Sequence, residues 1–224
     1  MLVSPGILHH LLSLSLVCSD TTGSFLRSGI PDVVVTTAPA PSLRDLYSEG
    51  QTFQQFLAAA DSKRAQWLSN YETGSVSDSL LARARAIPGS WRLLVIAEDW
   101  CGDSLNTMPY VARLVEGVPN LQMRIISSKR GRSVMKAHRT PDGRAATPTV
   151  ILLDDRYRES GCWIERPAEL QRWFQEKKKT LGEKELYDQK YAWYANDKGG
   201  QTIREIVEML THAAAGRPTC GKKA

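Results

Sequence analysis

The residues best suited to chemistry lie together in the segment Trp100-Cys101-Gly102-Asp103-Ser104. The near-continuous apolar run over residues 91–97 predicts a strand buried on both faces. Residues 103–115 have helical spacing, so Cys101 is expected in the first turn of a helix. Unpaired backbone N–H groups and the positive end of the helix dipole favour a thiolate there. Because the thiolate is the form that attacks disulfides, we predict that Cys101 is a nucleophile.

The residues around Cys101 adjust this prediction. Gly102 keeps the turn narrow and lets another backbone approach. The Ser104 side chain can hydrogen-bond the thiolate or the helix backbone. Asp99 and Asp103 oppose thiolate formation by charge repulsion, unless they point into solvent. An inert, buried cysteine is the alternative for Cys101, because free cysteines are often buried.

The elements that must position this segment form an alternating pattern. The order from Trp91 is strand, helix, strand, helix, strand, strand, helix, which predicts an α/β fold with a mixed sheet and helices on both faces. The late hairpin adds an antiparallel strand to an otherwise parallel core. Strands are predicted over residues 91–97, 121–126, 149–153 and 159–164, and helices over 103–115, 133–138 and 167–174.

Additional helices flank this pattern on both sides. Thr52 and Gln55 fit a capping box, and apolar residues then recur at helical spacing through Tyr71, so we predict one helix over that stretch. A shorter helix is expected over 77–86. Beyond the core, residues 183–195 and 202–214 are predicted helices. We therefore divide the chain into 1–42 (leader or flexible linker), 43–88 (helical extension), 89–215 (main domain with C-terminal helices) and 216–224 (loose tail).

The N-terminal segment leaves the compartment open. Residues 7–18 form a short apolar run that is too short to span a bilayer, with an extended piece expected at 33–35. The run has the apolar character of a signal peptide, but no Lys or Arg precedes it and His9-His10 interrupt it. We expect a cytoplasmic protein somewhat more than an exported one.

Three features together resemble the thioredoxin superfamily. An apolar strand runs directly into residues 100–104, and Pro109 follows Cys101 by eight residues, where thioredoxins have a helix-kinking proline. Thr147-Pro148 opens the third strand, where the family has a cis-proline that faces the reactive thiol. The phrase Glu98-Asp99-Trp100-Cys101-Gly102-Asp103, with Trp163-Ile164-Glu165-Arg166-Pro167 later, is similar to a bacterial subgroup of single-cysteine thioredoxin-like proteins.

The resemblance implies an activity and also shows two departures from the family. It implies thiol–disulfide exchange or isomerase-type chemistry at Cys101, with Trp100, Gly102, Thr147 and Pro148 binding the substrate. We predict that Ser104 is a catalytic residue together with Cys101. It stands where a dithiol enzyme has its second cysteine, so we do not expect an internal dithiol cycle. Val95 stands where thioredoxins have a buried acid, so proton transfer from such an acid is not expected.

The partners that follow are protein thiols or disulfides, with glutathione or another small thiol as a further partner. The alternative is a redox-inactive thioredoxin-fold module that binds peptides or partner proteins. A weaker possibility is a peroxide-responsive thiol that cycles through sulfenic acid.

The remaining composition excludes several other functions. The chain has a net charge of +5, and its basic residues form only short clusters without interleaved aromatic residues. This pattern does not favour nucleic-acid binding. No cysteine pair has C-x-x-C or zinc-finger spacing, so we predict no metal site, no cofactor and no dense disulfide framework. Cys162 is predicted as a small hydrophobic strand residue rather than a resolving cysteine. Cys18 and Cys220 lie in segments expected to be poorly structured, and the histidines receive no catalytic role.

Overall fold

The computed structural model of the chain describes residues 40–220. Residues 1–39 of the predicted leader or linker, which include the apolar run, Cys18 and the extended piece at 33–35, lie outside this range, as do the last four residues of the tail. No helix within it is long and apolar enough to cross a membrane.

A mixed sheet forms the centre of the described part, with strand order β2-β1-β3-β4-β5. Strand β1 runs parallel to β2 and antiparallel to β3, β3 runs antiparallel to β4, and β4 runs parallel to β5. The predicted mixed sheet is confirmed, but its centre is not parallel, because β3 enters beside β1 in the opposite direction. The strand bounds are β1 (Trp91–Ile96), β2 (Leu121–Ile126), β3 (Thr149–Leu153), β4 (Glu159–Ile164) and β5 (Thr219–Cys220).

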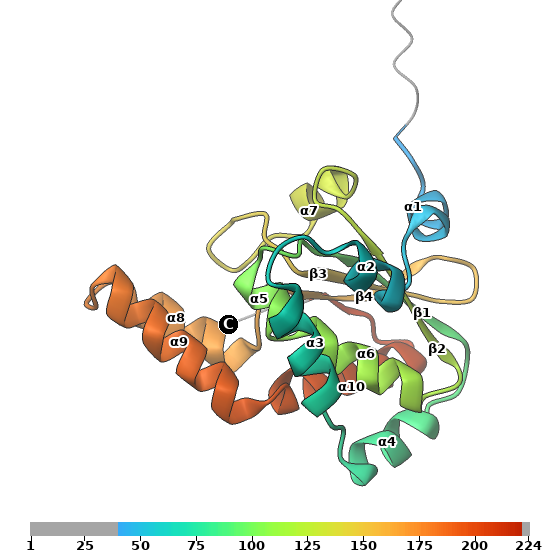
Figure 1. The fold of residues 1–224 in the computed structure, drawn as a ribbon. Helices are drawn as coiled ribbons and strands as arrows, with labels where there is room; N and C mark the ends of the chain where they lie inside the picture. Colours follow the sequence, from blue (N-terminus) through green and yellow to red (C-terminus); the bar gives the residue numbers. More distant parts are fainter. Residues whose placement is uncertain (1–39, 221–224) are drawn as a thin grey trace, which may run out of the picture. The chain divides into compact units, whose positions relative to one another are not determined.

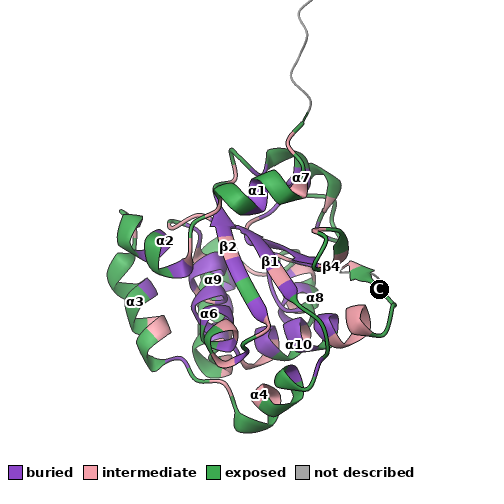
Figure 2. Cartoon of the chain, turned by 90° about the vertical axis from the view of Figure 1, so that its right-hand side faces the viewer, coloured by how far each residue is buried: buried purple, intermediate pink, exposed green. Residues whose placement is uncertain are grey.

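Helices cover both faces of the sheet, as the pattern predicted (Figure 1). One face packs against α6 and α10, and behind them lie α3 and α4, while the other packs against α1 and α7. Figure 2 shows β1 as almost entirely buried, whereas buried residues of β2 alternate with exposed and half-buried ones near its start. The helix bounds are α1 (Leu43–Glu49), α2 (Phe53–Ala59), α3 (Arg64–Thr73), α4 (Asp78–Arg85), α5 (Gly102–Leu105), α6 (Met108–Gly117), α7 (Arg132–Ala137), α8 (Ala168–Lys177), α9 (Glu183–Asp197) and α10 (Gly200–Ala214).

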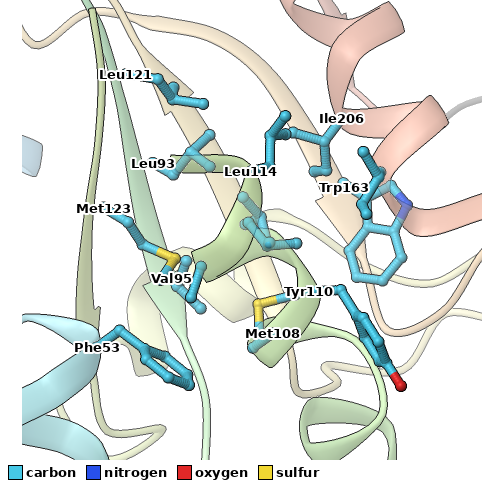
Figure 3. Packing of buried hydrophobic residues seen from close by; sticks show 14 of the residues in the cluster. Phe53, Leu93, Val95, Met108, Tyr110, Leu114, Leu121, Met123, Trp163 and Ile206 are labelled. Atoms are coloured by element: carbon cyan, nitrogen blue, oxygen red, sulfur yellow. The ribbon is translucent and has the colours of Figure 1, made fainter. Parts of the chain in front are cut away.

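The larger hydrophobic core lies between the sheet and α6. Leu93 and Val95 of β1 are fully buried and point toward Met108 and Leu114 of α6 (Figure 3). Each such side chain contributes about 1.5–3 kcal/mol by leaving water. This packing holds the end of β1, and hence the segment that follows it, against the start of the α5–α6 pair.

Two predicted helices are each interrupted. The helix expected from Thr52 is two helices, α2 and α3, and Lys63 between them has a left-handed backbone (φ 53°). The capping box of Thr52 and Gln55 is present. The helix expected after Cys101 is likewise divided into α5 and α6, with Pro109 in the first turn of α6, where its missing N–H costs nothing.

The C-terminal end is more ordered than the predicted loose tail. Thr219–Cys220 form β5, which pairs with Gly161 and Cys162 of β4. Cys162 and Cys220 form a disulfide that closes a separation of 58 residues. The expectation of an unpaired hydrophobic Cys162 was therefore wrong. The physical reason is tertiary: β5 returns along β4 in a register that places the two cysteines opposite each other.

Candidate active site

Cys101 lies at the N-terminus of α5, immediately after the β1 strand and its short loop. It is the N-cap residue of α5, and its Sγ accepts the Ser104 backbone N–H at 3.5 Å. It is the one free cysteine among residues 40–220. The residue is only 9% exposed, so Cys101 is largely buried. A thiolate here would receive a helix N–H group and the positive end of a short helix.

The backbone before the third strand approaches Cys101 from the other side. The Cys101 thiol donates to the Thr147 carbonyl oxygen at 3.3 Å. The Thr147-Pro148 peptide bond is cis. Thr147 is half-buried and Pro148 is buried. The structure therefore brings together Cys101, Thr147 and Pro148, three of the residues that the sequence assigned to one site.

Ser104 and Gly102 act differently from their predicted roles. The Ser104 hydroxyl is completely buried and has no hydrogen-bond partner in the described range, so it bonds neither the sulfur nor the helix backbone. Ser104 contacts Cys101 through its backbone N–H alone. At Gly102, an added Cβ would collide with the Tyr191 hydroxyl of α9. The close approach that the glycine permits is thus made by a side chain of this chain.

The loop before Cys101 is held by the interruption between α2 and α3. The backbone N–H groups of Asp61 and Ser62 both donate to the Asp99 carboxylate, each at 2.8 Å. The indole N–H of Trp67, which is fully buried, donates to the Asp99 carbonyl oxygen at 2.8 Å. The helix ends at Ala60 because these N–H groups serve Asp99 instead of a continuing helix. Asp99 is therefore engaged away from the sulfur rather than repelling it freely.

Asp103 lies at the centre of a buried charge network. Its carboxylate accepts hydrogen bonds from Lys190 (3.2 and 3.4 Å) and Tyr194 (2.8 Å) of α9, and from Arg166 (3.1 Å). Arg166 also donates to Glu165 at 2.7 Å. All five residues are buried, and Glu165 also accepts two hydrogen bonds from the exposed Arg144, at 3.0 and 2.8 Å. We call these five residues the Asp103 network.

Burial and charge shift the pKa values of the α9 side chains that border the site. Burial lowers the pKa of Lys190, while the charges of Asp103 and Cys101 act in the opposite direction. Burial also raises the pKa of Tyr191, with further contributions from Asp103 and Cys101. Burial and then Asp103 raise the pKa of Tyr194 well above its ordinary value. The Tyr191 hydroxyl also lies against Gly102, so α9 borders the site directly beside Cys101.

The contribution of α9 to the site was not predicted from the sequence. Tyr187, Lys190, Tyr191 and Tyr194 follow the spacing i, i+3, i+4 and i+7, which puts them on one helix face. A single lysine within a tyrosine stripe is a signal for a buried, paired cation. The signal did not show which carboxylate pairs with it, because α5 and α9 are about 80 residues apart and meet only in the tertiary structure.

The other predicted residues lie as follows. Trp100 is largely exposed, at 59%. Val95 is completely buried within the apolar core, between Ile125 of β2 and Val150 of β3. Cys162 cannot resolve a Cys101 disulfide in this state, because it is bonded to Cys220.

Two known structures resemble this chain. A crystal structure of a protein of unknown function from Pseudomonas aeruginosa matches with a TM-score of 0.62 and 22% identity, over 77% of this chain and 99% of that one. An HIV epitope scaffold matches with a TM-score of 0.60 and 20% identity, over 76% of this chain and 98% of that one. At these identities the likeness concerns the fold. Among curated proteins, none matches the chain.

The fold and the site together define the class of protein. A mixed sheet, covered on both faces, presents a cysteine at a helix N-terminus beside a cis-proline. A family model described as thioredoxin matches residues 50–179, which is more than half of the chain. The chain belongs to this thioredoxin family.

Proposed function

We propose that this protein is a monothiol exchange protein, in which Cys101 attacks disulfides or exchanges with small thiols. The observation that carries the proposal is the position of the Cys101 sulfur. It lies between the N-terminus of α5 and the carbonyl oxygen of Thr147, with the Ser104 N–H directed at it. A buried structural cysteine has no need of a free helix N–H, whereas a nucleophilic thiolate is stabilised by one.

The exchange step needs no external oxidant. The Cys101 thiolate attacks one sulfur of a substrate disulfide, a Cys101–substrate S–S bond forms, and the substrate S–S bond breaks. The other substrate sulfur leaves as a thiolate and takes a proton from solvent. A second thiol, on a protein or on a small molecule such as glutathione, then attacks the mixed disulfide and releases Cys101. The number of disulfides is the same before and after each step.

The monothiol character follows from the residues nearest the sulfur. Ser104 replaces a second thiol at the C-x-x-S position, and Cys162 and Cys220 are bonded to each other. Within the described range, no other free thiol is available to release a substrate from Cys101. We therefore infer that a mixed disulfide on Cys101 waits for an external thiol.

A substrate peptide would reach the sulfur past exposed aromatic side chains. Trp100 is exposed, and Tyr187 and Tyr191 of α9 are each 39% exposed. Tyr191 lies against Gly102, next to the reactive residue. We propose that Trp100, Gly102 and Tyr191 contact the substrate, while Thr147 and Pro148 form the opposite wall. This role for Tyr191 adds to the residues that the sequence indicated.

A trapping experiment with a matched variant tests the proposal. The wild type is expected to form a mixed disulfide with a glutathione-disulfide or peptide-disulfide probe, detected by mass spectrometry, and to keep it until a thiol is added. Ser104→Cys restores a C-x-x-C pair and should release the same probe without added thiol. Cys101→Ser should trap nothing. The proposal is wrong if Cys101 alkylates no faster than a free cysteine and captures no probe.

The second candidate function is a docking module without redox chemistry. The 9% exposure of Cys101 and the missing second cysteine favour it. In that case Cys101→Ser should bind a partner peptide as tightly as the wild type, whereas Trp100→Ala should weaken binding. Loss of binding in Cys101→Ser alone would favour the exchange function.

A further inference from the structure

A second group of sulfur and nitrogen donors lies outside the candidate active site. Cys162 of β4, Cys220 of β5 and His138 after α7 bring their ligand atoms within 4.8 Å of one another. Cys162 is 4% exposed and the His138 side chain 12% exposed. Cys220, like His138, is half-buried. These three residues are far apart in sequence, which is why no zinc-type spacing was visible.

The His138 ring makes one of the two contacts expected of a metal-binding histidine, and a carboxylate occupies the other. Its Nδ1 lies 2.8 Å from the Val134 carbonyl oxygen and is placed to donate to it. Its Nε2 lies 2.8 Å from a Glu159 carboxylate oxygen and donates to it, so Nε2 must give up this proton and this hydrogen bond before it can bind a metal. Metal-binding histidines commonly bond their other ring nitrogen to a backbone carbonyl, as Nδ1 does here.

We propose that the Cys162–Cys220 pair is a redox-controlled zinc site, closed in the oxidised protein and opened by reduction. Two cysteine thiolates and one imidazole are the donor set that Zn²⁺ prefers, in tetrahedral coordination with a fourth ligand. In such a site the two sulfurs lie about 3.7 Å apart, which follows from zinc–sulfur distances of about 2.3 Å. Breaking the disulfide frees the two sulfurs to separate, while the pairing of β4 with β5 keeps both cysteines at one place in the sheet.

The chemistry balances with a dithiol as the reductant. Its two thiols deliver two electrons, the S–S bond of Cys162 and Cys220 breaks, and each sulfur becomes a thiol while the reductant becomes a disulfide. Zn²⁺ then replaces the two thiol protons and any proton on His138 Nε2. In the oxidised form the sulfurs have no thiolate to offer, so the same three residues bind no zinc.

The site would also link β5 to the sheet in either redox state. The disulfide ties Cys220 to β4 when oxidised, and the metal would tie it to Cys162 and His138 when reduced. Reduced protein without metal has neither link. This predicts that the C-terminal end is least protected in the reduced, metal-free protein.

A cobalt and zinc titration on the full chain tests the proposal. The variant Cys18→Ser/Cys101→Ser removes the two other cysteines, so thiol counts report only the pair and the result is independent of chemistry at Cys101. After reduction by a soluble dithiol and its removal without oxygen, Co²⁺ should produce thiolate charge-transfer and tetrahedral d–d absorption. Zn²⁺ should displace it. The oxidised sample should produce neither signal.

Ligand variants in the same background separate a built site from loose thiols. Replacing either Cys162 or Cys220 by Ser should abolish the cobalt spectrum. Losing a residue that only hydrogen-bonds to a metal ligand costs roughly 10–100-fold in affinity, and His138→Gln should weaken zinc binding by more than this because it removes a ligand itself. The proposal is overturned if the dithiol exposes no free thiols in the folded variant, because the disulfide then does not open. It is also overturned if the reduced protein gives no tetrahedral cobalt spectrum, or if the His138→Gln variant binds zinc as tightly as the protein with His138.

Discussion

The Asp103 network makes a quantitative prediction through the substitution Asp103→Asn. The carboxylate is 7% exposed and accepts from Lys190, Arg166 and Tyr194. Asparagine keeps the shape and removes the charge. Arg166 keeps its ion pair with Glu165, but within the described range Lys190 has no carboxylate partner other than Asp103. The variant therefore leaves a buried ammonium without its counter-charge.

The magnitude follows from the cost of an unpaired buried charge. Removing one partner of a buried pair costs about 3–5 kcal/mol. For a domain of this size, each kcal/mol lowers the melting temperature by about 2–4 °C, so Asp103→Asn should lower it by roughly 6–20 °C. The free energy of unfolding is measured by urea denaturation with tryptophan fluorescence, with the disulfide kept oxidised throughout.

Two further variants make the measurement decisive. Asp188→Asn is the matched control, because its carboxylate pairs with Lys184 on the exposed side of α9, and we expect no measurable change. The double variant Asp103→Asn/Lys190→Met removes both charges and should lose about 1–3 kcal/mol less than the sum of the single variants. A loss below about 1 kcal/mol for Asp103→Asn, or strict additivity in the double variant, would refute the reasoning.

Three other predictions concern the parts that surround the site. Trp67→Phe removes the hydrogen bond to the Asp99 carbonyl and leaves a small cavity in the core. It should lower the free energy of unfolding by about 2–3 kcal/mol in urea denaturation and accelerate alkylation of Cys101. Burial lowers the pKa of Lys190 below 10.5, so at pH values between its folded pKa and 10.5 the unfolded chain binds more protons. The free energy of unfolding should therefore rise with pH in that window, and a Lys190→Met variant measured from neutral to mildly alkaline pH should lose this slope. Cys220→Ser opens a 58-residue loop and should cost up to about 4 kcal/mol in the oxidised protein, measured by thermal melting, and an unchanged melting temperature would contradict a structural disulfide.

Much of the frame around Cys101 was predictable because its determinants are local. The four long strands appear within one residue of their predicted bounds, since each is an apolar run between clear breaks. Thr52 and Pro109 mark helix starts through capping and through proline's missing N–H, which are also local effects. The placement of Cys101 at the start of a helix, and of Thr147-Pro148 before a strand, follows from the same patterns.

What the sequence could not determine depends on contacts between distant segments. The helix after Thr52 stops at Ala60 because Asp99, nearly forty residues away, takes the next N–H groups. Periodicity continues through that gap, so no local signal marks it. Likewise the sequence allows Ser104 to bond the thiolate, but in the folded chain its hydroxyl is buried without a hydrogen-bond partner in the described range.

The sequence by itself determined the type of fold and the identity of its one central thiol, since alternating apolar runs and a cysteine at a strand-to-helix junction are local patterns. Only the tertiary structure decided which charges surround that thiol and which cysteines pair. Lys190 meets Asp103, and Cys220 meets Cys162, across separations of 87 and 58 residues. Charge pairing and disulfide formation act through space at a few ångströms, and sequence spacing carries no information about such distances once the chain has folded back on itself.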